Sequence, residues 1–349
     1  MNIVVTGGAG FIGQALVRRL RGLNHRVMVA DRIATHDSSI ACWTGDLSFR
    51  DAPHQAIPPG TEVVIHLAAA TSVLGSIAHP ITVYRDNVAV TQALLERCRA
   101  IGVKQFIFCS TNAVAGTVGA LPLSEETPLK PLTPYGATKA AGEMLVAGYA
   151  SAYDQMGTIL RLTNVYGPGM HRKDTIVARL MRAALINAPI TIYGTGQQVR
   201  DYVYLEDVVN AFVLALEKPW NGPLVVGSGT VVSVNDLHRL TSQVCDAAIP
   251  VMHVAAPRGE MPAVRVDVTR AHAMGFMPET SLLEGLSTVW DDFRRWYQST
   301  SNQKAMARSN NYSPAAHLQS AGSERTAPPI GYGNRFEAGN TSLNPIRPG

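Results

Sequence analysis

A glycine-rich turn joins the first predicted strand of this 349-residue chain to its first predicted helix. The turn reads Thr6-Gly7-Gly8-Ala9-Gly10-Phe11-Ile12-Gly13, directly after the apolar residues 3–5. Glycines at this spacing permit a tight turn, a close approach of the backbone to a diphosphate, and close packing of the helix on the strand. The amide groups and the positive dipole at the start of the helix then face the phosphates. The turn predicts a dinucleotide site with contacts from Gly7, Gly10, Phe11, Ile12 and Gly13.

The alternation of strand and helix continues over residues 1–165. Strand-like runs lie at residues 3–6, 26–30, 63–67, 105–110 and 158–162, and helices are predicted near residues 83–100 and 134–153. Such alternation implies an α/β fold, a doubly wound parallel sheet of the Rossmann type. Beyond residue 165 the pattern is irregular, which predicts a smaller and discontinuous second lobe.

Three regions follow from these patterns. We expect a dinucleotide-binding domain over residues 1–163, to which later parts of the chain return, and a lobe over residues 164–297 that binds mainly the substrate. Over residues 298–349 Ser, Asn, Gln, Gly and Pro replace large apolar residues. Such a composition cannot bury enough apolar surface to order itself, so we expect a flexible tail there.

Composition and motif spacing argue against several classes of protein. No apolar run approaches the roughly 18 residues that a membrane span needs, and a formal charge of +4 is small for a nucleic-acid-binding protein. The four cysteines form no C-x-x-C pair, and the histidines show no metal-ligand spacing. The start of the chain resembles a strand rather than a signal peptide. We expect a cytoplasmic protein without a metal, bound neither to membranes nor to nucleic acid.

Asp31 ends the second predicted strand, where an acidic residue completes a dinucleotide fingerprint. Its carboxylate accepts hydrogen bonds from ribose hydroxyls and repels a 2′-phosphate, so the sequence favours NAD over NADP. The neighbouring Arg32 weakens this preference, because an arginine there accommodates a 2′-phosphate.

Two further segments are candidates for cofactor contacts. Asp46 and Leu47 follow a short strand-like piece and are placed to meet the adenine, although a plain surface turn explains them nearly as well. Small residues after the strand over residues 63–67 let a cofactor pass close to the backbone, which makes Leu67, Ala68 and Ala69 candidates. His66 is at least as readily a strand-end histidine with satisfied hydrogen bonds as a cofactor ligand.

Tyr135 and Lys139 are spaced i and i+4 on a predicted helix, so their phenol and ammonium share one face. Thr133 suits the N-cap of that helix and Pro134 its first position. A nearby ammonium lowers the pKa of a tyrosine from about 10, which brings proton transfer near neutrality within reach. Thr111 ends an earlier strand and offers a hydroxyl to the same substrate oxygen. These three are the candidate catalytic residues, although the Tyr and Lys spacing also arises by chance.

Together, the glycine turn, the strand-end threonine and the Tyr-x-x-x-Lys motif resemble the extended short-chain dehydrogenase/reductase superfamily, most closely its nucleotide-sugar epimerases of the UDP-glucose 4-epimerase type. The resemblance covers residues 1–297 and includes the segments 161–168, 199–207 and 257–260 in the family order. It implies bound NAD, a UDP-sugar substrate and redox-neutral epimerisation at carbon 4. Tyr135 would be the base, Lys139 would also hold the nicotinamide ribose, and Thr111 would bind the reacting oxygen.

The resemblance also implies a diphosphate site and an assembly. Asn164, Arg200 and Arg258 match positions that hold the nucleotide diphosphate, and arginines suit this role because they donate bidentate, charge-assisted hydrogen bonds. A surface salt bridge is a reasonable alternative for Arg258. A homodimer formed through the helices near residues 83–100 and 134–153 is expected.

Departures from the family pattern narrow the chemistry. The 4,6-dehydratases carry Asp-Glu after the catalytic threonine, whereas this chain has Asn112-Ala113, so dehydration is disfavoured. Ala115 replaces a tyrosine, and Val264 lies where some epimerases carry a bulky aromatic residue; both predict room for a larger sugar substituent. UDP-glucose, UDP-glucuronate and UDP-N-acetylglucosamine all stay open as substrates. The alternatives are a nucleotide-sugar reductase or dehydrogenase, and a non-catalytic NAD-binding regulatory protein.

Overall fold

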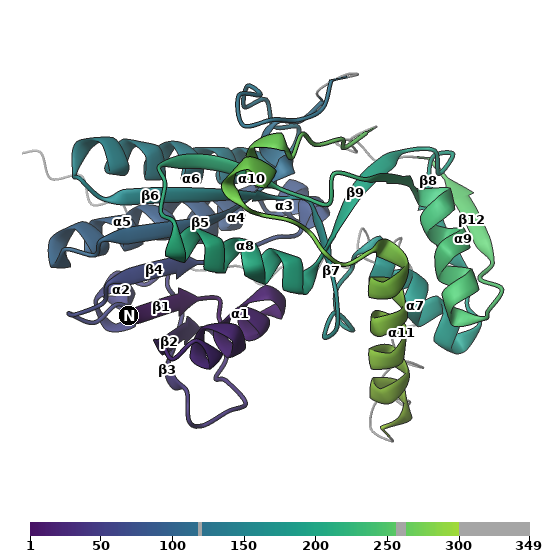
Figure 1. Cartoon of the computed structure of the whole chain (residues 1–349), viewed down its shortest axis with the longest axis horizontal. Coiled ribbons are helices and arrows are strands. Elements are labelled where there is room, and N and C mark those ends of the chain that lie inside the picture. Colours follow the sequence, from purple (N-terminus) through teal and green to yellow (C-terminus); the bar gives the residue numbers. More distant parts are fainter. Residues whose placement is uncertain (118–120, 256–262, 300–349) are drawn as a thin grey trace, which may run out of the picture. The chain divides into compact units, whose positions relative to one another are not determined.

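Seven parallel strands form the central sheet of the computed structural model (Figure 1). Their spatial order is β10 (Gly222–Val226), β6 (Met156–Leu162), β5 (Gln105–Thr111), β4 (Val63–His66), β1 (Asn2–Thr6), β2 (Arg26–Asp31) and β3 (Ala41–Thr44). The structure describes residues 1–117, 121–255 and 263–299. The winding direction reverses between β1 and β4, and ligands of such sheets bind outside the carboxyl ends of the strands at this reversal. The predicted Rossmann-type fold is confirmed.

Helices cover both faces of this sheet because successive strand residues point to opposite sides. On one face, Val5 and Ile65 pack with α1 (Phe11–Gly22) and α8 (Leu205–Glu217). On the other, Val4 and Phe106 pack with α5 (Val90–Ile101) and α6 (Pro134–Ala152). The short helices α2 (Ala52–Ala56) and α10 (Thr269–Met274) add Ala56 and Ala271 to these two cores. Both faces are therefore buried, which explains the continuous apolar runs of the strands.

The later part of the chain contains two small sheets. β7 (Asn164–Tyr166) and β11 (Val231–Ser233) flank β9 (Val199–Tyr204), and β8 (Ile190–Tyr193) pairs with β12 (Val251–Val254). A separate core, which includes Met181, Leu237 and Phe293, joins α7 (Ile176–Ile186), α9 (Val234–Cys245) and α11 (Leu282–Gln298). From this later part of the chain, β10 forms an edge strand of the central sheet and α8 packs against one face of it.

Residues Met1–Gln298 form one compact unit. The predicted tail lies, from residue 300 onward, outside the described residues. Within the part that the structure describes, no helix is long and apolar enough to cross a membrane.

The helix predicted over residues 83–100 is interrupted. After α3 (Val73–Ala78), the chain forms α4 (Pro80–Tyr84), a π-helical turn over Arg85–Ala89, and then α5. Asp86 and Asn87 in this turn are buried polar residues, with 8% and 2% of their surface exposed. A π-turn carries an extra residue relative to an α-helix and is frequent at functional sites. Here it provides inward-facing positions for two polar side chains in an otherwise apolar helix.

Helix α6 begins and is anchored as its sequence requires. The Thr133 side chain accepts a hydrogen bond from the Gly136 amide, which confirms the predicted N-cap. Farther along the helix, Glu143 pairs with Arg161 of β6, with 2.8 Å between Oε2 and Nη2. Glu143 Oε1 also accepts a hydrogen bond from Ser110 Oγ of β5. Glu143 thus holds α6 on β5, which ends at Thr111, and on the neighbouring β6.

We predict that Glu143→Gln destabilises the fold strongly. The substitution leaves Arg161, whose side chain is 5% exposed, without its buried counter-charge. Breaking a buried pair by removing one partner costs about 3–5 kcal/mol, which urea denaturation at neutral pH measures as the free energy of unfolding. Asp291→Asn is the control: it removes the exposed partner of Arg294 and should cost at most about 1 kcal/mol. Equal losses in the two variants would contradict the prediction.

Candidate active site

The predicted cofactor and catalytic segments meet at the carboxyl edge of the central sheet. Thr6, Asp31, His66 and Thr111 end β1, β2, β4 and β5. Because β5, β4, β1 and β2 are consecutive neighbours in the sheet, these four residues lie in a row. The candidate residues predicted from the sequence therefore lie at the edge where parallel sheets bind ligands.

The glycine turn fits a dinucleotide diphosphate. Gly10 is the N-cap residue of α1, and no side chain caps the amides of this first turn. Unsatisfied amides at a helix start bind phosphates. Gly7 has a φ of +73°, and a Cβ there would lie 2.7 Å from the Ala68 amide nitrogen. A Cβ at Gly13 would lie 2.2 Å from the Gly7 carbonyl oxygen. The glycines thus allow the turn to pack on itself and on the segment over residues 67–69.

Two acidic residues near the carboxyl edge of the sheet, Asp46 and Asp86, contact the side chain of Arg32. Asp31 accepts a hydrogen bond from the Ala9 amide at 3.0 Å, so the β2 end and the glycine turn are joined directly. Arg32 Nη2 lies 2.9 Å from Asp86 Oδ2 and 3.2 Å from Asp46 Oδ2. Leu47, also a predicted contact, is 7% exposed, and its side chain belongs to the core beneath β1 and β4. The end of β2 is joined to the residue before Asp46 by a hydrogen bond from the Gly45 amide to the Asp31 carbonyl oxygen at 2.9 Å.

His66 is a buried structural residue. Its Nδ1 lies 2.7 Å from Thr6 Oγ1 and its Nε2 lies 3.0 Å from Thr91 Oγ1, so both ring nitrogens have hydroxyl partners. Burial lowers the pKa of His66 to about 3, and the Lys139 charge adds to this effect. The imidazole is therefore neutral at physiological pH, and the structure favours a strand-end histidine with satisfied hydrogen bonds over a direct ligand.

Tyr135 lies in the first turn of α6, beside Thr111. The Tyr135 side chain is half-buried, and burial raises its pKa above the ordinary value. The Cys109 thiol contributes in the same direction, and a hydrogen bond with Thr111 opposes both. The pKa of Tyr135 is therefore raised, contrary to the lowering expected from Lys139, because the cost of burying a phenolate dominates.

Lys139 is 3% exposed, and its Nζ lies 4.3 Å from the centroid of the Phe108 ring. Burial lowers the pKa of Lys139, whereas the Cys109 thiol and the Glu143 carboxylate raise it. A buried ammonium over an aromatic face is stabilised by the ring quadrupole. The side chain thus sits below Tyr135 on the same face of α6, as the spacing predicts.

Asn87 connects the cofactor edge to α6 and was not identified from the sequence. Its Oδ1 accepts a hydrogen bond from the Ala70 amide at 2.8 Å, and its Nδ2 donates to Thr138 Oγ1 at 2.9 Å. Thr138 in turn donates to the Tyr135 carbonyl oxygen at 2.8 Å. The chain of contacts fixes the first turn of α6 relative to the segment over residues 67–70. The only signal for Asn87 in the sequence is that a polar residue interrupts an apolar helical pattern.

The residues predicted to hold the substrate come from β7 and β9. Asn164 pairs in register with Tyr202, so that Asn164 and Arg200 lie on neighbouring strands. Asn164 Nδ2 donates to the Asp201 carbonyl oxygen at 2.9 Å, and Arg200 Nη1 donates to the Val199 carbonyl oxygen at 2.9 Å. Both side chains are half-buried. Arg258, the third predicted member, lies outside the described residues.

Lys173 is a further cation at this site that the sequence did not indicate. It lies in the loop between β7 and α7, and its Nζ is 5.7 Å from the centroid of the Phe11 ring in the glycine turn. Desolvation lowers the pKa of Lys173, and the Cys109 thiol opposes this. The loop is tied to α11, because Asp292 accepts a hydrogen bond from the Gly169 amide at 2.7 Å and pairs with His171.

The expectation of extra room beside the sugar is wrong. Ala115 and Val264 are only 2% and 3% exposed. Both pack in one apolar cluster with Leu123, Val225 and Val266. Neighbouring side chains thus fill the space around the small Ala115, and Val264 is part of this cluster rather than of an open site. These two positions carry no information on sugar size.

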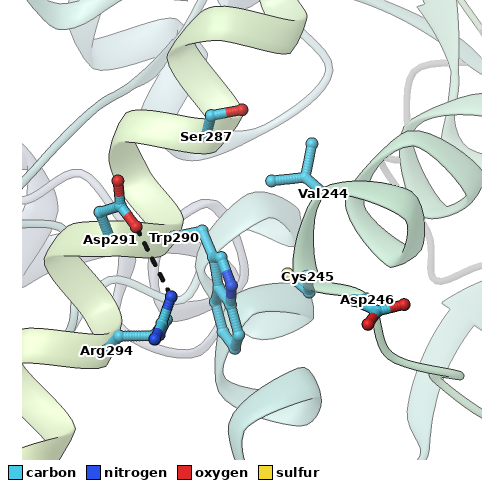
Figure 2. A pocket seen from close by; sticks show the side chains of 7 residues that line it. All are labelled: Val244, Cys245, Asp246, Ser287, Trp290, Asp291 and Arg294. Carbon is cyan, nitrogen blue, oxygen red and sulfur yellow. Dashed lines mark ion pairs between the residues drawn. The ribbon is translucent and has the colours of Figure 1, made fainter.

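A cavity of about 340 Å³ lies elsewhere, between α9 and α11 (Figure 2). Trp290 of α11 projects toward Cys245 and Asp246, and Asp291 pairs with Arg294 at its rim (Figure 2). The cavity is lined by Val244, Cys245, Asp246, Ser287, Trp290, Asp291 and Arg294. None of the predicted site residues is among them, so this cavity is separate from the edge that carries Tyr135.

Comparison with known proteins agrees with this geometry. A family model for the NAD-dependent epimerase/dehydratase family matches residues 3–227. The UDP-glucose 4-epimerase of Mycolicibacterium smegmatis is 34% identical over 311 residues, covering 84% of this chain and 99% of the relative. A UDP-glucose 4-epimerase from Thermotoga maritima, solved with UDP-glucose, has a TM-score of 0.80 and 32% identity, covering 85% of this chain and 100% of its own. MoeE5, solved with UDP-glucuronic acid and NAD, has a TM-score of 0.79 and 35% identity over the same shares.

The buried His66 predicts a specific pH dependence of stability. Its pKa falls from 6.5 in the unfolded chain to about 3 in the folded protein, so below pH 6.5 the unfolded state binds the extra proton. Stability is therefore lost as the pH falls. Between pH 6.5 and 4.5 this one group lowers the free energy of unfolding by about 2–3 kcal/mol. His66→Gln keeps two hydrogen-bonding groups without the titration. We expect urea denaturation to show a shallower acid slope for the variant; parallel slopes would contradict the prediction.

Proposed function

Since the chain belongs to the NAD-dependent epimerase/dehydratase family, we propose that it is a 4-epimerase of UDP-hexoses. The observation that carries the proposal is the cluster of Thr111, Tyr135 and Lys139 at the carboxyl edge of the sheet, beside an uncapped glycine turn. A phenol hydrogen-bonded to a hydroxyl is suited to move a proton at one sugar oxygen. Solved relatives that hold UDP-glucose or UDP-glucuronic acid support a UDP-sugar as the ligand.

In this proposal Tyr135 and Thr111 act on the 4-hydroxyl of the sugar. Bound NAD supplies a hydride acceptor and later a donor, together with a positive charge that favours a phenolate. Thr111 donates a hydrogen bond to the reacting oxygen, and Tyr135 Oη removes its proton as carbon 4 is oxidised to a ketone. After the 4-keto sugar turns over, Tyr135 returns the proton as carbon 4 is reduced on the opposite face. Atoms and electrons balance without an external reductant.

The first turn of α1, Asp31, and Lys139 would hold the cofactor. Their geometry supports this role, because the amides of the turn are uncapped, the Asp31 carboxylate lies beside that turn, and Lys139 lies one helical turn below Tyr135. Ala68 and Ala69 offer small side chains where the chain passes the turn. NAD has to stay bound through the cycle, and several anchoring points along the sheet edge serve that requirement.

Asn164, Arg200 and Arg258 would anchor the diphosphate of the substrate. The sugar has to leave the nicotinamide, rotate and return while the nucleotide stays in place, so the anchor belongs on different elements from the catalytic residues. The position of Asn164 and Arg200 on the adjacent strands β7 and β9, rather than on α6, supports this division. Among UDP-glucose, UDP-glucuronate and UDP-N-acetylglucosamine, the buried Ala115 and Val264 give no preference.

The residues after Thr111 disfavour dehydration, the other activity in the family name. Asn112 is 7% exposed, and its Oδ1 accepts a hydrogen bond from Thr111 Oγ1 at 3.1 Å. Ala113 follows, so neither position carries the carboxylic acid that water elimination would need. A reductase or dehydrogenase that consumes NAD(H) is the second candidate, since it would use the same Tyr135 and Lys139. A non-catalytic NAD-binding protein would not need the Tyr135–Thr111 pair.

The direct test is an assay of the purified full chain with UDP-glucose, UDP-glucuronate and UDP-N-acetylglucosamine, without added reductant. We expect the 4-epimer of at least one of them, resolved by chromatography, with no net NADH. Tyr135→Phe should lower the rate at least about 100-fold, because general acid–base catalysis is lost. Tyr153→Phe, at the exposed end of the same helix, is the matched control and should keep wild-type activity.

The outcomes separate the candidates. Accumulation of NADH would indicate a dehydrogenase instead of an epimerase. A wild-type protein that binds NAD but leaves all three sugars unchanged would favour the non-catalytic protein. Full activity of Tyr135→Phe would remove Tyr135 from the mechanism.

We also propose a homodimer, formed through an apolar surface on α3, α4 and α6. Exposed on it are Val73, Leu74, Ile77, Ile81, Tyr84 and Met144. Ile81 alone is 83% exposed. Farther along α6, Ala147 and Gly148 are exposed, and their small size lets a second helix approach closely. The proposed surface uses α6, as expected from the sequence, but takes α3 and α4 in place of the helix expected near residues 83–100.

A charge placed on this surface should prevent dimerisation. Met144 is 64% exposed on α6, and Met277, 59% exposed between α10 and α11, is its matched control. We expect the wild type and Met277→Glu to have the mass of a dimer by sedimentation equilibrium, and Met144→Glu the mass of a monomer. A monomeric wild type, or an unchanged mass for Met144→Glu, would contradict the proposed surface.

A further inference from the structure

Two residues with opposite consequences for cofactor choice are adjacent at the end of β2. A carboxylate at this position binds the ribose 2′-hydroxyl of NAD, whereas a nearby arginine accommodates the 2′-phosphate of NADP. Asp31 is followed directly by Arg32, so the sequence alone contains both determinants. The structure shows how the arginine is used.

Arg32 is held by two carboxylates, those of Asp46 and Asp86. Its Nη2 lies 2.9 Å from Asp86 Oδ2 and 3.2 Å from Asp46 Oδ2. Asp86 is the more buried partner, with a side chain 8% exposed, and its Oδ1 pairs with Arg85 Nη2 at 2.9 Å. Each oxygen of Asp86 therefore has a guanidinium partner. The hydrogen bond with Asp86 is also the main cause that raises the pKa of Arg32.

The position of Asp86 comes from the π-helical turn over Arg85–Ala89. Asp86 contacts Arg32 on the cofactor side, while the next residue, Asn87, contacts Ala70 and Thr138 on the catalytic side. The backbone around Asp86 is thus fixed by its neighbour. A carboxylate on a fixed backbone holds an arginine more strictly than one on a mobile loop, because less side-chain and backbone entropy is lost on pairing.

We propose that Asp86 is a determinant of cofactor choice: it holds Arg32 away from the ribose, so that Arg32 is not available to a 2′-phosphate. Two obstacles then oppose NADP. Asp31 repels the phosphate, and Arg32 would have to leave a largely buried carboxylate in order to bind it. Removing either obstacle alone leaves the other in place. The effects of substituting Asp31 and Asp86 on NADP affinity should therefore be strongly non-additive. The inference rests on the NAD dependence of the family and is independent of which sugar is the substrate.

The test measures binding of NADP⁺ and NAD⁺ by calorimetry to the full chain freed of nucleotide. Asp31→Ser removes the repulsion, and Asp31→Ser/Asp86→Asn also removes the charge of the more buried of the two carboxylates that hold Arg32, so that only Asp46 still pairs with it. The matched control is Asp31→Ser/Asp37→Asn, which makes the same change of charge at the carboxylate that pairs with Arg21 on the surface. We expect the Asp86 double variant to bind NADP⁺ about tenfold or more tightly than the Asp37 double variant, as one charge-assisted arginine–phosphate contact provides.

Removing the arginine completes the test. Arg32→Ala added to the Asp86 double variant should abolish the gain, whereas Arg32→Ala added to Asp31→Ser alone should leave NADP⁺ affinity unchanged, because Asp86 already holds the side chain there. This second comparison keeps Asp86 intact and needs no change in the π-turn. Equal NADP⁺ affinity of the two double variants, or a tenfold loss on adding Arg32→Ala to Asp31→Ser, would overturn the proposal. Because only binding is measured, the result is separate from the outcome of the epimerase assay.

Discussion

The buried pair of Glu143 and Arg161 fixes helix α6 on the central sheet, and this helix carries Tyr135 and Lys139. Both side chains are at most 5% exposed. Their desolvation is costly, so the pair persists only because Ser110 and backbone carbonyl oxygens satisfy its remaining groups. At the other end of α6, Asn87 and Thr138 join the first turn to the segment over residues 67–70. Hydrogen bonds and a buried ion pair, in addition to apolar packing, therefore fix the helix that carries Tyr135.

At the carboxyl edge of the sheet, polar side chains are likewise held by hydrogen bonds and ion pairs. Parallel strands bring Thr6, Asp31, His66 and Thr111 to one line. The titratable side chains His66 and Arg32 at this edge are neutral and paired, respectively. His66 stays uncharged, and Arg32 is paired with two carboxylates. The uncapped amides of α1 and the Tyr135 phenol lie at this same edge and are among the groups proposed to interact with a ligand. This distribution suits an enzyme that keeps one cofactor and does not exchange it for its phosphorylated form.

Local pattern was sufficient for part of this account. The glycine turn, the α6 cap at Thr133 and the alternation of strands and helices follow from spacing and propensity, because they involve residues close in sequence. The π-turn, Asn87 and Lys173 were missed, since their roles arise from contacts between distant segments. Burial explains the errors: the raised pKa of Tyr135 and the filled space around Ala115 depend on packing that no single segment reveals. The cytoplasmic location and the role of Arg258 stay predictions.

In the proposed mechanism, the hydride removed from carbon 4 returns to the same carbon from the same bound cofactor. An isotope label at carbon 4 tests this directly. A UDP-hexose deuterated at carbon 4 is converted by the full chain without added reductant, and the epimer is analysed by NMR and mass spectrometry. If carbon 4 is oxidised and then reduced from the same bound cofactor, the epimer keeps deuterium at carbon 4 and none enters the water or free NADH. An epimer that has lost the label, or a label recovered in released cofactor, would contradict the mechanism.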